Sequence, residues 1–338
     1  MTTTAETQTS STHPFVVRLK HSAQQLVVFA TLIVLIIGFS IASPAFATQA
    51  NISQLLLATA VTGIQALGLT FVIATGGIDL TPGLGMALCS VIMGVALRDA
   101  GVPILVGVLI AVSAGLLIGL LNGFLISYCR MQPMIATLAV MLICQGLALV
   151  VSGTKPVYLD SAEGFKEIAI SRVGVIGGFN GIPMAVVIFF AAAVLAALIL
   201  NKSTLGRYAI SIGSNEEATR ISGINVKRWK MSVYMLAGGF TGLSAVIMAA
   251  RLNAAQPATG VGYEMYAIAA VVIGGTSLRG GRANILGSVV GALVISTINT
   301  GLSILSVPDQ WQKVLLGAVV LIAVGVDTIR RSRTGDLD

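Results

Sequence analysis

Apolar runs of about 20 residues recur along almost the whole chain, the length that a helix needs to cross a hydrocarbon core about 30 Å thick. Of the 338 residues, 56% are hydrophobic and 10% are charged, against about 25% charged residues in soluble domains. Water is therefore not the main solvent of this chain. We predict an all-α polytopic membrane protein with about ten transmembrane helices, some of them short or broken.

Polar residues, glycine or proline separate the apolar runs and set the boundaries of the predicted helices. The ten predicted spans are Gln25–Ala42, Ile52–Thr75, Pro82–Leu97, Pro103–Ile126, Pro133–Val151, Pro183–Leu200, Met231–Ala250, Tyr263–Gly275, Asn284–Leu305 and Trp311–Val326. The eighth span is short enough to be a half-length helix, so we expect it to be tilted or broken.

One membrane domain is expected over residues 25–326, with tails at residues 1–24 and 327–338. The run Leu26–Ile41, followed by Ala45-Phe46-Ala47, has some features of a secretory signal peptide. It is longer than the usual apolar core of about 7–15 residues and follows a polar segment, so we favour an uncleaved first span.

The distribution of lysine and arginine predicts the orientation of the spans. With the N-terminus inside, 14 of the 20 basic residues fall on the cytoplasmic side, among them Arg207, Arg220 and Arg331. The residues left outside are Arg98, Lys155, Lys166, Arg172, Arg251 and Lys313. We therefore expect both termini and the loop at residues 201–230 to be cytoplasmic.

The net charge of +7 is spread through short loops, which favours membrane orientation over nucleic-acid binding. The three cysteines, Cys89, Cys129 and Cys144, lack any spacing typical of a metal site. Helix packing is their expected role, and no metal site is predicted. The small-residue spacing Gly115-x-x-x-Gly119-x-x-x-Gly123 likewise predicts close helix packing.

Two glycine-rich interruptions resemble each other. The stretch Gly76–Gly83 contains Asp79 and begins with Gly76-Gly77, and the stretch Gly274–Gly281 begins with Gly274-Gly275. Each stretch lies between two apolar runs, and paired interruptions of this kind are typical of transport sites built from discontinuous helices. Two independent interhelical turns are an equally good interpretation.

The loop at residues 201–230 contains a short helix signature. Ser214 is the predicted N-cap with Glu217 reaching back to it, Arg220 suits the C-terminal end, and Gly223 supplies a left-handed stop. A short capped helix in such a loop indicates either a docking element or an ordinary surface turn.

The same loop resembles the coupling loop of ribose-type ABC importer permeases in the runs Ser203–Tyr208, Ile212–Ala218 and Ile221–Val226. Further similar runs are Ala66–Thr70, Gly76–Leu80, Asn122-Gly123, Pro133–Leu138, Leu252–Pro257, Gly262–Glu264 and Ala267–Leu278. The resemblance covers about residues 44–327. Thr81-Pro82 departs from the Ser-Val pair expected at that turn.

This resemblance implies a permease subunit that moves a monosaccharide or related sugar across the bacterial cytoplasmic membrane by alternating access. It also implies a second permease copy or paralogue, separate ATP-binding-cassette subunits and an external sugar-binding protein. The implied ATPase contacts are Gly206, Arg207, Gly213, Asn215, Glu216, Glu217, Ala218, Ser222 and Gly223. No Gly-x-x-x-x-Gly-Lys-Ser/Thr loop is present, so we expect ATP to bind a partner chain and this chain to carry no cofactor and no catalysis.

Neutral polar residues inside the spans suit the hydrogen bonding of a sugar without fixed charge. The candidate path residues are Gln65, Asn122, Thr137, Gln145 and Asn299. The alternative is that they join helices by hydrogen bonds. Asp79 is expected to hydrogen-bond the turn that Thr81 caps, a structural role rather than a gating one.

A secondary transporter or channel for small polar solutes is the alternative function. That class generally needs acidic or basic side chains at membrane depth, and these spans are nearly free of them. An intramembrane enzyme is disfavoured because His13 and His21 precede the first span and no paired carboxylate or metal cluster lies at depth.

Overall fold

The computed structural model describes residues 14–176 and 179–332. Parts of both predicted tails, residues 1–13 and 333–338, therefore lie outside the described residues, as does His13. The helices are α1 (Pro14–Ala42), α2 (Gln49–Ala74), α3 (Pro82–Asp99), α4 (Ile104–Ser127), α5 (Pro133–Ser152), α6 (Glu167–Ile170), α7 (Met184–Lys202), α8 (Thr204–Ser214), α9 (Glu216–Ile221), α10 (Val226–Leu252), α11 (Tyr263–Ile273), α12 (Ile285–Ile304) and α13 (Asp309–Ser332).

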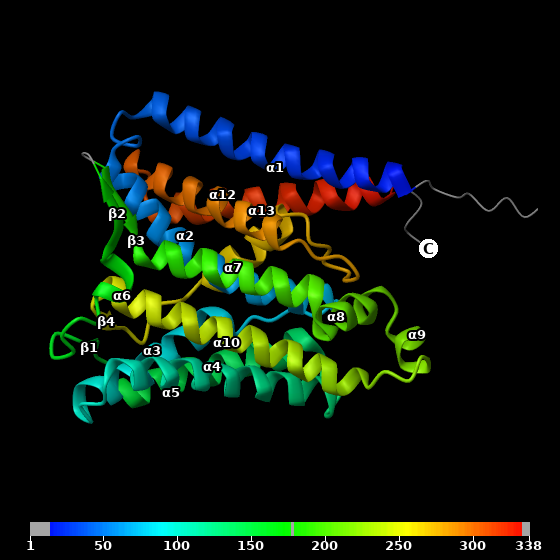
Figure 1. The fold of residues 1–338 in the computed structure, drawn as a ribbon, viewed down its shortest axis with the longest axis horizontal. Helices are drawn as coiled ribbons and strands as arrows, with labels where there is room; N and C mark the ends of the chain where they lie inside the picture. Colours follow the sequence, from blue (N-terminus) through cyan, green and yellow to red (C-terminus); the bar gives the residue numbers. More distant parts are fainter. Residues whose placement is uncertain (1–13, 177–178, 333–338) are drawn as a thin grey trace, which may run out of the picture.

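Two short strand pairs complete the fold. Strands β1 (Val157–Tyr158) and β4 (Ala254–Ala255) pair antiparallel, as do β2 (Arg172–Ile176) and β3 (Phe179–Pro183). Figure 1 shows the long helices running along the long axis, with all four strands at one end and α8 and α9 at the other. We call these the strand end and the coupling end.

Within residues 14–176 and 179–332, seven helices are long and apolar enough to cross a membrane: α2, α3, α4, α5, α7, α10 and α12. Shorter apolar segments are Leu26–Ala42 within α1 and the whole of α11. The structure is thus that of a mostly helical multi-pass membrane protein, as predicted, and the count of ten crossings stays a prediction.

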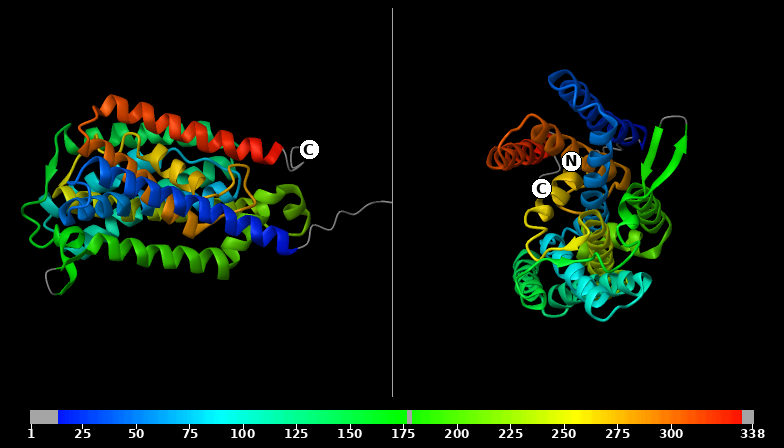
Figure 2. Two further views of the ribbon diagram at one scale, coloured as in Figure 1. Left: turned by 90° about the horizontal axis from the view of Figure 1, so that it is seen from above. Right: turned by 90° about the vertical axis from the view of Figure 1, so that its left-hand side faces the viewer.

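Helix α2 lies at the centre of the bundle. Its apolar window is 89% buried, whereas that of α4 is 22% buried and leaves leucines such as Leu105 and Leu117 exposed on the outside. An apolar exposed surface is stable against lipid rather than water. The right-hand view of Figure 2 looks along the bundle from the strand end.

Close packing of α4 against α10 uses the predicted small-residue spacing. A Cβ atom at Gly119 would lie 2.9 Å from the Tyr234 carbonyl carbon, and one at Gly123 would lie 2.7 Å from the Met231 Cα. Gly115 likewise faces the backbone of Gly242. Only glycine permits this approach, so the predicted packing role of Gly115, Gly119 and Gly123 is confirmed.

The cysteines differ in their surroundings. Cys89 and Cys144 are buried in the hydrophobic core, in agreement with the packing role, whereas Cys129 is exposed after the end of α4. The packing prediction is therefore wrong for Cys129.

Candidate functional site

Two short helices form the coupling end between α7 and α10. The Ser203 hydroxyl accepts a hydrogen bond from the Gly206 N–H at 3.3 Å and caps α8, and the Asn215 side chain accepts one from the Ala218 N–H at 2.8 Å and caps α9. The predicted cap at Ser214 is wrong, because Ser214 is the last residue of α8 and the extended backbone belongs to Asn215.

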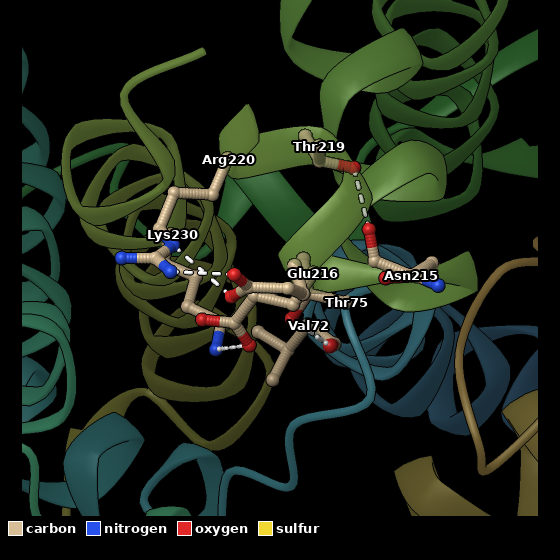
Figure 3. Close-up of polar contacts among 8 residues, drawn as sticks. Val72, Thr75, Asn215, Glu216, Thr219, Arg220 and Lys230 are labelled. Atoms are coloured by element: carbon tan, nitrogen blue, oxygen red, sulfur yellow. Dashed lines mark hydrogen bonds and ion pairs between the residues drawn. The ribbon is translucent and has the colours of Figure 1, made fainter. Parts of the chain in front are cut away.

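One ion pair lies within α9 and a second joins α9 to α10. Arg220 donates a 2.5 Å hydrogen bond to Glu217, so Glu217 does not close the predicted capping box, and Lys230 of α10 donates one of 2.6 Å to Glu216 (Figure 3). The hydrogen bond from Arg220 holds the pKa of the Glu217 carboxyl below its usual value. Gly223 follows α9 with φ +83°, which confirms the left-handed stop.

The exposed surface of α9 is mixed in character. Ile221 is 76% exposed at its end, beside exposed Glu217 and Arg220, while Thr219 is buried beneath. The outer face of this short helix is therefore accessible to another protein surface. The other predicted contacts on α9 and its ends, Ala218 and Ser222, are exposed as well.

Helix α8 packs onto the bundle through glycine. A Cβ atom at Gly213 would lie 2.5 Å from the Gly281 nitrogen and still closer to the Ala74 carbonyl oxygen. The Gly281 N–H itself donates a 2.9 Å hydrogen bond to that carbonyl. A Cβ atom at Gly280 would lie 2.7 Å from the Gly76 nitrogen and 2.8 Å from the Gly213 Cα. We call Ala74, Gly76, Gly213, Gly280 and Gly281 the glycine junction.

The junction brings together the two interrupted stretches that resemble each other in sequence. Helix α2 ends with the Gly77 N–H bonded to the Val72 carbonyl, and α11 ends with the Thr276 N–H bonded to the Val271 carbonyl, each at 3.2 Å. The left-handed glycines just before these donors are Gly76 (φ +77°) and Gly275 (φ +89°). The two turns are thus alike, with a one-residue offset from the sequence alignment.

Asp79 lies in the extended stretch after α2 and is 3% exposed. Its carboxylate accepts hydrogen bonds from the Thr81 N–H at 2.9 Å, from the Thr81 hydroxyl and from the Asn122 amide at 3.4 Å. Hydrogen bonding of Asp79 to its own turn is therefore confirmed. The predicted Thr81 cap is wrong, because that hydroxyl faces Asp79 and makes no capping bond to α3.

Three candidate path residues donate hydrogen bonds to neighbouring segments, although the amide oxygens of Gln65 and Asn122 are buried with no partner among the described residues. Asn122 donates to the Thr81 hydroxyl at 2.5 Å, and Thr137 to the Pro133 carbonyl at 2.9 Å and the Ile78 carbonyl at 3.5 Å. Gln65 donates to the Ser244 hydroxyl at 3.3 Å. This geometry favours the alternative that these residues join helices.

The other two candidates lie apart from these. Gln145 is half-buried on α5, between exposed Leu142 and Ile143 on one side and exposed Leu147 on the other. Asn299 lines a cavity of about 320 Å³ between α2, α10, α11, α12 and α13. The structure does not gather the five candidates into one path.

Sequence reasoning missed most of that cavity's lining. Tyr263 and Tyr266 of α11 and Arg251 of α10 line it together with Asn299. Tyr263 lies in the run Gly262–Glu264, which is part of the resemblance to ribose-type permeases. That run was the sequence signal that could have pointed to the cavity. Within the described residues, no group of three or more His, Cys, Asp or Glu side chains is placed to hold a metal ion.

Comparison with known proteins agrees with this architecture. Residues 51–324 match the family described as branched-chain amino acid transport system / permease component. The ribose import permease protein of Bacillus subtilis (strain 168) is 42% identical over 305 residues, covering 90% of this chain and 92% of that protein. The ribose import permease protein of Escherichia coli (strain K12) is 40% identical over 301 residues, covering 88% and 91%.

The D-allose transport system permease protein of Escherichia coli (strain K12) is 34% identical over 329 residues, covering 97% of this chain and 98% of that protein. No solved structure matches this chain significantly. The match to the family, over residues 51–324, includes both interrupted stretches and the coupling end. The chain therefore belongs to the family of membrane-spanning permease components of ABC importers, as a member of its ribose-type sugar permeases.

Proposed function

We propose that this permease imports a neutral monosaccharide across the bacterial cytoplasmic membrane, driven by separate ATP-binding-cassette subunits. The observation that carries the proposal is the glycine junction, where the coupling end touches the backbones of both interrupted stretches. A movement of α8 is thereby applied directly to α2 and to the segment between α11 and α12. Alternating access requires such a rigid coupling between a driven element and the spans.

The membrane topology that fits this role has ten crossings and cytoplasmic termini. Helix α11 has 11 residues and is about 16 Å long at 1.5 Å per residue, too short to cross alone. The stretch that follows it continues to Gly281, which meets α8 at the coupling end. Helix α11 and this stretch together complete one crossing. The first residues of α1 and the last residues of α13 lie toward the coupling end in Figure 1.

Helix α9 is the proposed ATPase contact. Its caps are worth about 1 kcal/mol each, too little to hold an isolated helix of six residues in place. The ion pair of Glu216 with Lys230 and the T-shaped contact of Tyr208 with Trp229, 4.8 Å between ring centroids, hold the α8–α9 unit against α10. A groove on the ATPase would cover the exposed Ile221.

The remaining partners follow from the importer class. We propose a second permease copy or a paralogue beside this chain, and an external sugar-binding protein at the strand end. A lone chain has no nucleotide site in its sequence, so the complete importer also needs two nucleotide-binding subunits.

A branched-chain amino acid is the second candidate substrate, because the matched family carries that description. Sugars are favoured by the relatives named for ribose and D-allose transport, at 34–42% identity. The neutral side chains of the interior also suit a solute without fixed charge.

The complete importer in proteoliposomes tests these proposals. Radiolabelled ribose, allose, xylose, arabinose and leucine would be offered with the cognate binding protein, and ATP-dependent uptake measured for each. We expect one of the sugars to accumulate and leucine to be ignored. Uptake of leucine alone would overturn the sugar proposal, and uptake of any solute without ATP would overturn the importer mechanism.

A further inference from the structure

The cavity that Asn299 lines opens toward the strand end, away from α8 and α9. Its deep part lies between Thr62 of α2 and Ser296 of α12, both nearly fully buried, and its mouth lies near Asp309 and Lys313 at the start of α13. The volume of about 320 Å³ is at the lower end of the range for small-molecule sites, which begins at about 300 Å³.

The deep lining carries neutral hydrogen-bonding groups that the protein itself leaves unused. Thr62, Ser296 and Asn299 all line the cavity, and none of their side chains makes a hydrogen bond within the described residues. Buried polar groups in folded proteins are normally paired. Groups left unpaired in a cavity are suited to a ligand with its own donors and acceptors.

Aromatic surface lies beside these polar groups. The rings of Tyr263 and Tyr266 are 5.6 Å apart between centroids at an interplanar angle of 62°, and both line the cavity. Tyrosine offers an apolar ring together with a hydroxyl, so it can contact both the C–H face and the hydroxyls of a sugar. Charged side chains are confined to the mouth, at Arg251, Asp309 and Lys313.

A dry layer closes the cavity on its inner side. Ala66 and Leu69 of α2, Ala267 and Ala270 of α11 and Ala292 of α12 are fully buried in one cluster, against which Tyr266 packs. Beyond this layer, toward the coupling end, the three helices lead to the glycine junction. The cavity, the closed layer and the junction therefore follow one another along the same helices.

We propose that this cavity is an outward-facing vestibule that receives a single neutral monosaccharide released by the external binding protein. Asn299, Ser296 and Thr62 bind its hydroxyls, Tyr263 and Tyr266 contact its ring, and the alanine-rich layer of α2, α11 and α12 is the gate beneath it. The assignment rests on the proposed import function and adds the substrate-contacting residues. An amino acid would need charged partners for both its ionic groups, and the deep lining has none.

Thiol protection tests binding without relying on transport. Asn299→Cys, in a Cys129→Ser background, would be reacted with a small membrane-impermeant methanethiosulfonate reagent, with and without excess ribose or leucine. The control is Tyr158→Cys, exposed at the same end but outside the cavity. We expect ribose to slow the reaction at position 299 and not at 158, and leucine to slow neither.

Equal rates at position 299 with and without ribose would overturn the vestibule, as would protection by leucine alone. Equal slowing at positions 299 and 158 would also overturn it, since the effect would then be general.

Transport by matched variants provides the second measurement. Asn299→Leu and Tyr266→Phe would be compared with Ser113→Leu, exposed on α4, and Tyr158→Phe, in complete importers of verified assembly. Loss of one hydroxyl contact corresponds to about a tenfold loss, so we expect sugar uptake to fall about tenfold in the first two. Binding-protein-stimulated ATPase activity should persist, because the coupling end is unchanged.

Wild-type uptake in both cavity variants would contradict the proposal. Loss of ATPase activity together with uptake would also contradict it, because such a joint loss indicates a structural role for these residues. Failure of the import function itself is distinguished by the wild-type complex, which would then transport no sugar at all.

Discussion

The Gly281 N–H donates a 2.9 Å hydrogen bond to the Ala74 carbonyl, joining two stretches more than 200 residues apart in the chain. Gly213 of α8 lies directly against both groups. The two interrupted stretches and the coupling end therefore meet at one backbone contact, and side chains are excluded from it. A small movement of α8 cannot be absorbed there by side-chain rotation.

Gly213→Ala is predicted to uncouple the importer. The added Cβ would lie within 2.5 Å of backbone atoms that cannot rotate away, so α8 must shift or the hydrogen bond must break. We expect a cost of about 1–3 kcal/mol at this contact. Basal ATPase activity of the assembled complex should persist while uptake per ATP falls strongly.

The matched control is Gly146→Ala on α5, where nothing lies within 4 Å of the added Cβ. That variant should transport as the wild type does and gain up to about 1 kcal/mol of helix stability. Wild-type coupling in Gly213→Ala would show that the junction does not transmit movement.

Breaking α9 is predicted to uncouple ATP hydrolysis from uptake without unfolding the spans. Proline at Glu217 removes a backbone donor inside a six-residue helix, and valine at Gly223 opposes its φ of +83°. Both variants should insert and assemble, measured by gel filtration, and lose sugar-stimulated ATPase activity. If ATP hydrolysis stays coupled to uptake in both variants, α9 is an ordinary surface turn and not the ATPase contact.

Glu217→Gln is the milder control. Because the hydrogen bond from Arg220 lowers the pKa of Glu217, the ion pair is fully formed above the usual carboxyl pKa of about 4.3 and is lost as the pH falls below it. The pair is fully exposed and screened by solvent. Coupling should therefore be nearly unchanged in Glu217→Gln and constant between about pH 6 and 8.

Topology can be checked by labelling single cysteines in a Cys129→Ser background, since Cys89 and Cys144 are buried. In intact cells, an impermeant maleimide should react with Tyr158→Cys at the strand end and not with Ile221→Cys on α9. Both positions are well exposed, at 62% and 76%, so a difference reports the side of the membrane. Reaction at position 221 from outside would reverse the proposed orientation.

The sequence predicted contacts that depend on spacing along one helix. The Gly115, Gly119 and Gly123 repeat on α4 places three glycines on one face, and that face packs on α10. Caps were less predictable. Ser214 and Asn215 both suit an N-cap chemically, and the choice depends on which residue has extended backbone, here Asn215 with φ −160°.

The cavity could not be predicted for a related reason. Thr62, Tyr266 and Asn299 are brought together by the packing of three helices, and no spacing within one helix indicates it. Neutral polar residues within apolar runs look alike in sequence whether they join helices, as Gln65 does, or face a cavity, as Asn299 does. Only the positions of their partners separate the two roles.

Asn122 provides the test of that distinction. Its amide is fully buried and donates to the Thr81 hydroxyl and to Asp79, which ties α4 to the extended stretch after α2. Asn122→Leu removes both donated hydrogen bonds and leaves the buried carboxylate with fewer partners. Leaving such a group underpaired costs about 1–3 kcal/mol, so the detergent-solubilised protein should melt at a lower temperature and express poorly.

A path residue and a structural residue respond differently to this change. Asn122→Leu should lower uptake in proportion to the loss of folded protein, so that uptake per assembled importer stays within about twofold of wild type, whereas Asn299→Leu should lose about tenfold at unchanged stability. Asn122→Asp removes the amide donor as well and adds a second carboxylate beside Asp79, so it should destabilise more than leucine does. Normal melting of Asn122→Leu with strongly reduced uptake per importer would place Asn122 on the sugar path instead.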